Sequence, residues 1–320
     1  MKQVLEFEKP LVKTREELDE LRRRQNVKPS DKLAAQIADL EKRFHRLQQE
    51  IYAHLTPWQR VQIARHTQRP YMLDYAKLCF EEFMEVHGDR HIGDDNAMPG
   101  GFATIGGRRV VLVGQQKGRD TKENLLRNFG SAHPEGYRKA LRLMRLAEKF
   151  SLPVVSLIDT PGAFPGIGAE ERNIAEAIAC NLREMMIIGT PMVSVVIGEG
   201  GSGGALGIGV TDRVLMLENA YYSVISPEGC AAILWKDRKH APEAADALKL
   251  SAQHLKELGV IDGIVSEPAG GAHHDHIAAA ELLKAGLLAA LDDLSRISTR
   301  ELLAKRYEKF RAFGKFTELP

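Results

Sequence analysis

Apolar residues recur every three or four positions between Ser30 and His54, and this spacing predicts an amphipathic helix. The residues that make up its apolar face are Leu33, Ile37, Leu40, Phe44, Leu47 and Ile51. Pro29 and Ser30 suit the start of this helix. A shorter antiparallel helix before it is indicated by Leu11, Leu18 and Leu21. We therefore expect a helical hairpin, packed either on its own domain or against another chain.

Beyond this hairpin, helical and strand-like patterns alternate along the chain. Helical segments are expected over residues 71–86, 134–150, 169–188, 277–291 and 298–310. Three further helical segments are expected to start at Thr56, near Ala241 and near Ser251. The strand-like segments are 110–115, 153–158, 191–197, 214–217, 221–226 and 260–265. Strands separated by helices imply parallel pairing through crossover connections, so the predicted class is α/β.

Unusual residues follow three successive strands of this predicted sheet. Lys117-Gly118-Arg119 follows the first strand, residues 159–163 (DTPGA) follow the second, and a glycine-rich turn within 198–209 follows the third. Ligands of open α/β sheets bind beyond the carboxyl ends of the strands, so the three loops are expected to form one site. Asp159 is expected to brace its loop, because the Thr-Pro-Gly after it is typical of a turn.

The glycine turn carries the clearest candidate chemistry. Gly200, Gly201, Gly203 and Gly204 lack a Cβ atom, so a ligand can approach the backbone closely. The first amides of the helix that follows have no intrahelical acceptor, and they favour negative charge where they point. The turn is therefore interpreted as an oxyanion hole, and the alternative is a turn that needs glycine for tight packing alone.

Two other motifs overlap the same turn. Gly198-x-Gly200-x-x-Gly203 matches a dinucleotide fingerprint, with Glu218 near the expected distance, but the following crossover allows only about two helical turns. Gly200-x-Ser202-x-Gly204 matches the nucleophile elbow of serine hydrolases. A serine hydrolase that uses Ser202 therefore stays open as the alternative function, with candidate partners His240, His254 and Asp246.

Composition adds mainly exclusions. The 320 residues carry a net charge of +1, which gives no argument for a nucleic acid or a membrane surface as partner. Three scattered cysteines and the lack of a signal-like or membrane-spanning apolar run favour a cytoplasmic protein. His273, His274 and His276 lie in a predicted loop without a spaced partner, so no metal site is predicted.

Two long runs are especially distinctive, DTPGAFPGIGAEERN (159–173) and IGEGGSGGALGIG (197–209). Further distinctive runs are ARHTQRPYMLDY (64–75), GDR (88–90), QQKGRDTKEN (115–124), RNFGSAHPEGYRKALRLM (127–144) and YSVISPEGCAAILWK (222–236). Together these runs resemble the carboxyltransferase α subunit of bacterial acetyl-CoA carboxylase. The resemblance covers nearly the whole chain and is weakest over the first thirty residues and 237–250.

The resemblance implies a crotonase-like spiral of β-β-α units over residues 56–320, preceded by an N-terminal helical extension over 1–55. It also implies that the backbone amides of Gly203 and Gly204 are the catalytic oxyanion donors. The residues that it implies for substrate binding are Gly162, Ala163, Gly200, Gly201, Lys117 and Arg119. For Lys117 and Arg119, a role in surface salt bridges is an equal alternative.

The same resemblance implies that the enzyme is active only with a β subunit of related fold, in an α2β2 assembly. That subunit carries a zinc ribbon and most of the CoA contacts, and no cofactor or metal is expected on the present chain. Carboxyl transfer from carboxybiotin on the biotin carboxyl carrier protein to acetyl-CoA gives malonyl-CoA for fatty acid synthesis. Biotin carboxylase is the further partner in the wider complex.

Overall fold

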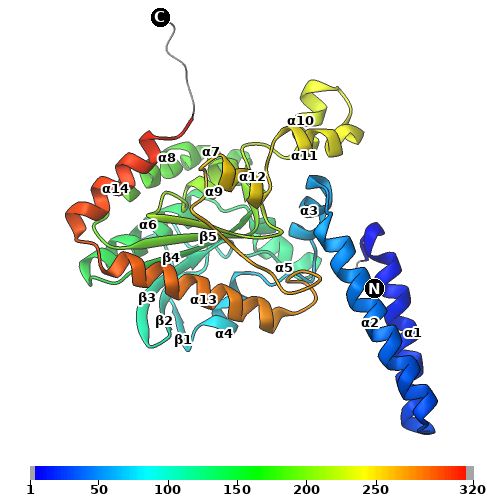
Figure 1. Ribbon diagram of the computed structural model, residues 1–320. Coiled ribbons are helices and arrows are strands. Elements are labelled where there is room, and N and C mark those ends of the chain that lie inside the picture. Colours follow the sequence, from blue (N-terminus) through cyan, green and yellow to red (C-terminus); the bar gives the residue numbers. More distant parts are fainter. Residues whose placement is uncertain (1–3, 315–320) are drawn as a thin grey trace, which may run out of the picture.

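The computed structural model describes residues 4–314. A sheet lies at the centre with helices packed around it, and a hairpin of two long helices projects to one side (Figure 1). The neighbouring strands of the sheet follow the order β1-β2-β3-β4-β5-β6-β8, and β7 pairs separately with β5. Residues of β4 and β5 are buried along their whole length, so the apolar core lies on both faces of these strands.

The sheet has an antiparallel edge and a parallel centre. The antiparallel strands are β1 (Glu82–Glu85), β2 (Gly100–Ile105) and β3 (Arg108–Gly114), and β2 and β3 are joined through Gly106-Gly107. The parallel strands that continue from β3 are β4 (Val154–Thr160), β5 (Met192–Gly201), β6 (Arg213–Leu217) and β8 (Gly263–Val265). The α/β class predicted from the alternating pattern is therefore confirmed.

Strand β5 changes its partner along its length. Residues 193–196 pair with β6, whereas residues 199–201 pair with β7 (Tyr221–Ser223). On the other side, the register between β4 and β5 shifts between Ile158 and Thr160. The end of β5, which leads into the glycine turn, is therefore enclosed by β7 and by the loop after β4, residues 161–166 (the β4 loop).

The N-terminal hairpin forms as predicted. Helices α1 (Lys9–Val27) and α2 (Asp31–Ala53) pack together, and the Ser30 side chain caps α2 by accepting a hydrogen bond from the amide of Leu33 at 3.2 Å. Leu11, Leu18 and Phe44 form the small apolar core between the helices. A boundary between the extension and the main domain at residue 55 stays a prediction.

The remaining helices surround the sheet. They are α3 (Pro57–Ala64), α4 (Met72–Cys79), α5 (Thr121–Leu126), α6 (Pro134–Lys149), α7 (Ile167–Glu171), α8 (Ile174–Met185), α9 (Ser202–Leu206), α10 (Pro227–Leu234), α11 (Ala241–Ala247), α12 (Ala252–Glu257), α13 (His276–Ser295) and α14 (Thr299–Arg311). Short 3-10 turns lie at Glu6–Glu8, Asn128–Gly130 and Arg238–His240. Among residues 4–314, no helix combines the length and the apolar character needed to cross a bilayer.

Two predicted helices were wrong in extent. The helix predicted over 71–86 ends at Cys79, because residues 82–85 form the edge strand β1 against β2. The helix predicted over 169–188 is two helices, α7 and α8, broken at Asn173, whose φ of 64° is left-handed. The strands predicted over 221–226 and 260–265 are shorter than expected, three residues each.

Candidate active site

The loop after β3 meets the carboxyl ends of β4 and β5 at one buried lysine. The ammonium group of Lys117 donates to Asp159 Oδ1 at 2.6 Å and to Glu199 Oε1 at 2.8 Å. The amide of Glu199 also donates to Asp159 Oδ1, at 2.9 Å. The convergence predicted from the three loops is therefore confirmed, and Asp159 braces its loop as expected.

Glu199 sits at the centre of this buried network. Its second oxygen accepts from Arg65 Nε at 2.8 Å and from the Tyr221 hydroxyl at 2.6 Å. Burial raises the pKa of Glu199, but Lys117 and Arg65 outweigh burial and lower it to about 2. The carboxylate is therefore charged at neutral pH, and it ties the end of β5 to β3, β7 and the segment after α3.

Lys117 and Arg119 are both engaged within the chain. Only 12% of the Lys117 side chain is exposed. Arg119 donates to the carbonyl oxygens of Thr67 and Arg69, pairs with Asp74, and lies 3.8 Å above the ring of Tyr71. These contacts favour the salt-bridge interpretation over direct contact with an anionic ligand for both residues.

Close packing explains why three of the four glycines that define the turn have no room for a side chain. A Cβ atom on Gly204 would lie 2.6 Å from Ala163 N and 2.6 Å from Gly162 C, and one on Gly201 would lie 2.2 Å from Pro161 O. On Gly200 it would meet the Tyr222 ring at 2.8 Å. Gly203 differs, because the nearest atom to its Cβ position is Ile178 Cδ1 at 3.8 Å. Its lack of a side chain is therefore not explained by crowding within the chain.

The peptide groups of the turn have fixed orientations. The carbonyl oxygen of Gly204 accepts from Gln115 Nε2 at 2.9 Å and from the Tyr137 hydroxyl at 3.3 Å. Gln115 Oε1 accepts from the amide of Asp159 at 3.1 Å, so one side chain holds both loops. The amide of Gly162 donates to Thr160 Oγ1 at 3.0 Å, which leaves Ala163 as the better donor candidate in the β4 loop.

An apolar groove of about 370 Å³ opens beside the turn. This volume lies within the range of about 300–1,000 Å³ that is usual for small-molecule sites. Its lining includes Ser202, Gly203, Leu206, Tyr222, Val224 and Phe310. A ligand in the groove can therefore approach the one glycine of the turn whose Cβ position is not crowded by the chain.

Sequence reasoning assigned no role to several residues that organise this site. Gln115, Glu199 and Tyr221 each lie in, or next to, a family-like run, but nothing in the local pattern shows which side chains meet. Of these three residues, only Glu199 could have been identified from the sequence. An acidic residue between glycines at the end of an apolar strand is expected to be buried, and it then needs a partner.

The histidines proposed as hydrolase partners are engaged elsewhere. His254 Nδ1 lies 2.9 Å from Ser251 Oγ, and His240 Nδ1 lies 3.4 Å from Glu243 Oε1. Ser202 itself opens α9 with a φ of 47°. The motif match therefore supplies a serine without the base that a nucleophile requires.

We expect Ser202→Ala to retain most of the activity of the assembled enzyme, within about threefold, because the hydroxyl performs no chemistry. The measurement is the turnover rate of the variant beside the parent, with labelling of the parent by a serine-directed fluorophosphonate. Labelling at Ser202 that disappears together with activity in the variant would contradict this expectation.

The class follows from the fold and the braced glycine turn, and solved structures agree with it. Transcarboxylase 12S superposes with a TM-score of 0.56 and 20% identity, over 70% of this chain and 41% of that chain. A Pseudomonas malonate decarboxylase hetero-tetramer gives a TM-score of 0.55 and 16% identity, over 68% of this chain and 86% of that chain. The chain therefore has a crotonase-like fold.

The comparison of sequences is more specific. Residues 4–314 match the family model described as acetyl co-enzyme A carboxylase carboxyltransferase-like. The alpha subunits of acetyl-coenzyme A carboxylase carboxyl transferase from Thermus thermophilus and Geobacter metallireducens are 54% and 53% identical, each over 98% of this chain and 99% and 98% of their own lengths. The chain belongs to the family of these alpha subunits. The resemblance is confirmed, and the comparisons give no support to the serine hydrolase alternative.

Proposed function

We propose that the amides of Gly203 and Gly204 stabilise the negative charge that develops on the ureido oxygen of biotin during carboxyl transfer to acetyl-CoA. The observation that carries this proposal is the position of both amides in the first turn of α9, where Gly203 lines an open groove and the Gly204 peptide is held by Gln115. N–H groups at the second and third helical positions have no acceptor within the helix. They are therefore available to an oxyanion.

Carboxybiotin, delivered on its carrier protein, supplies the activated carboxyl group. The present chain orients the ring and holds the charge, because backbone donors that need no reorganisation stabilise an oxyanion most strongly. Ala163 is a third candidate donor, since its nitrogen lies directly against Gly204. Removal of one such donor costs about 3–4 kcal/mol in well-studied sites.

The second half of the site is assigned to the β subunit, which carries zinc and contacts CoA. Exposed apolar residues support an incomplete site, since Val224, which lines the groove, is 77% exposed and Leu234 of α10 is 65% exposed. Ile233 and Trp235, at the end of α10 and just beyond it, are exposed as well. Exposed apolar residues gathered in a patch are typical of a partner-binding face. An α2β2 assembly in the cytoplasm, working with the carrier protein and biotin carboxylase, completes the proposal.

We expect the purified chain alone to form no measurable malonyl-CoA from acetyl-CoA and carboxybiotin, because it holds half of the required groups. Addition of the β subunit is expected to restore turnover. The measurement is malonyl-CoA formation by mass spectrometry, with the β subunit alone as the control. Robust product from the single chain would overturn the division of roles.

A further inference from the structure

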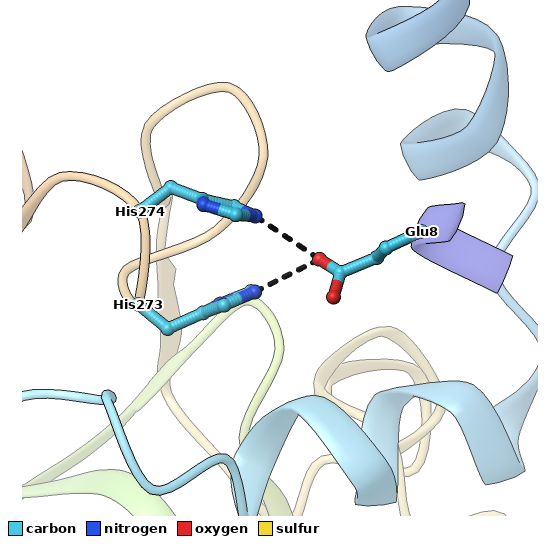
Figure 2. Close-up of side chains that lie close together, drawn as sticks. All are labelled: Glu8, His273 and His274. Carbon is cyan, nitrogen blue, oxygen red and sulfur yellow. Dashed lines mark hydrogen bonds and ion pairs between the residues drawn. The ribbon is translucent and has the colours of Figure 1, made fainter. Parts of the chain in front are cut away.

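Three side chains converge where the N-terminal hairpin meets the main body (Figure 2). Glu8 lies just before α1, and His273 and His274 lie in the loop between β8 and α13. Glu8 Oε1 is 3.0 Å from His273 Nε2 and 3.1 Å from His274 Nε2. The hairpin is therefore joined to the body by residues that belong to opposite ends of the chain.

One carboxylate oxygen of Glu8, Oε1, has three close polar neighbours. The Tyr52 hydroxyl donates to Glu8 Oε1, and both imidazole nitrogens lie within hydrogen-bond distance of the same oxygen. A carboxylate oxygen offers about two lone-pair directions. If one cation accepts the lone pairs of both imidazoles and of Oε1, only the Tyr52 hydrogen bond remains on that oxygen.

The three groups combine two buried side chains with one that solvent can reach. Glu8 and His273 have 4% and 1% of their side chains exposed, whereas His274 has 27% exposed and leaves a route from solvent. A carboxylate and two imidazoles are oxygen and nitrogen ligands of the kind that zinc binds in proteins.

The spacing also suits a single ion. The candidate ligand atoms of the three residues all lie within 4.8 Å of one another. Two ligands about 2.0–2.1 Å from one zinc ion are separated by about 2.8–3.4 Å at angles of 90–110°. The two oxygen–nitrogen distances in the structure fall within this range.

We propose that Glu8, His273 and His274 bind one divalent transition-metal ion of the zinc class, with water completing the coordination. Tyr52 holds the ligating carboxylate in place, as outer-shell donors commonly do. The ion fastens the hairpin to the body. The sequence analysis predicted no metal site, because the third ligand lies 265 residues from His273. His276 is outside the site, since its Nε2 lies against the carbonyl oxygen of Gln68.

The test uses the tag-free, full-length chain without the β subunit, stripped of metal by a chelator. The chain is titrated with CoCl2 while the visible absorption is recorded, and with ZnCl2 by calorimetry. We expect one ion per chain and a higher melting temperature with ZnCl2, since an ion that binds the folded state stabilises it. Glu8→Gln and His274→Asn are expected to weaken binding by at least about tenfold.

His276→Asn is the matched control, because it removes a neighbouring histidine and leaves the three ligands in place. Its affinity is expected to equal that of the parent. His274→Asn changes a partly exposed side chain, so it keeps the test decisive if Glu8→Gln fails to fold, which circular dichroism reports. Three results would overturn the site: no stoichiometric binding by the parent, unchanged affinity in folded His274→Asn, or equal loss in His276→Asn.

Discussion

Gly204→Ala is expected to lower the kcat of the assembled carboxyltransferase by about a hundredfold. The added Cβ would lie 2.6 Å from Ala163 N and 2.6 Å from Gly162 C, and both are backbone atoms of the β4 loop. Because neither loop can yield by a side-chain rotation, the turn and the β4 loop must move apart. A displacement of about 1 Å at a catalytic group costs on the order of a hundredfold in rate.

Gly203→Ala is the comparison for this prediction. Its Cβ has ordinary contact with Ile178 Cδ1 at 3.8 Å, so the β4 loop keeps its place, and any loss of turnover reports crowding of the ligand in the groove rather than displacement of the loop. Melting temperature and copurification with the β subunit must be measured for both variants, because Gly204 is buried and its substitution also strains the fold. Normal turnover by a folded, assembled Gly204→Ala enzyme would remove the oxyanion proposal.

Glu199→Gln is expected to lower the free energy of unfolding by about 3–5 kcal/mol, because it leaves Lys117 and Arg65 without their shared buried charge. The measurement is urea denaturation at pH 7. The loss of stability at low pH supplies a second readout. The pKa of Glu199 falls from 4.5 to about 2 on folding, so its contribution is complete above pH 4.5 and is lost as the pH falls towards 2. The variant should lose less stability than the parent over that interval.

Glu228→Gln serves as the comparison, since Glu228 pairs with the same Arg65 but has 32% of its side chain exposed. We expect this substitution to cost at most about 1 kcal/mol. Equal losses in the two variants would show that Glu199 acts as one more surface partner of Arg65 rather than as the centre of the network.

The elements with a regular pattern over many residues could be predicted from the sequence. The hairpin, the parallel strands and the glycine turn all depend on spacing within about 25 residues, which sequence periodicity records directly. Strand β1 was missed because it is short, lies at the edge of the sheet and exposes most of its side chains. Its conformation is determined by pairing with β2, and the sequence of residues 82–85 alone does not indicate that pairing.

The site was predictable only in part for a similar reason. The glycine cluster indicates the turn from the local sequence alone, and the order of the strands brings the three loops to one edge of the sheet. The side chains that hold the turn come from distant positions, as Arg65 and Glu199 do, 134 residues apart. Their meeting depends on tertiary packing, so Lys117 could be placed near the site while its role as a buried brace could not.

The contact between Glu8 and His273 also sets an order of events during protein synthesis. At about 5–20 residues per second, a ribosome adds the 265 residues between them in roughly 13–53 s. Once residue 53 has been added, the hairpin is complete while the loop that anchors it has not been translated. The α1–α2 packing, which needs only residues 9–53, must hold the nascent hairpin together until the last third of the chain emerges.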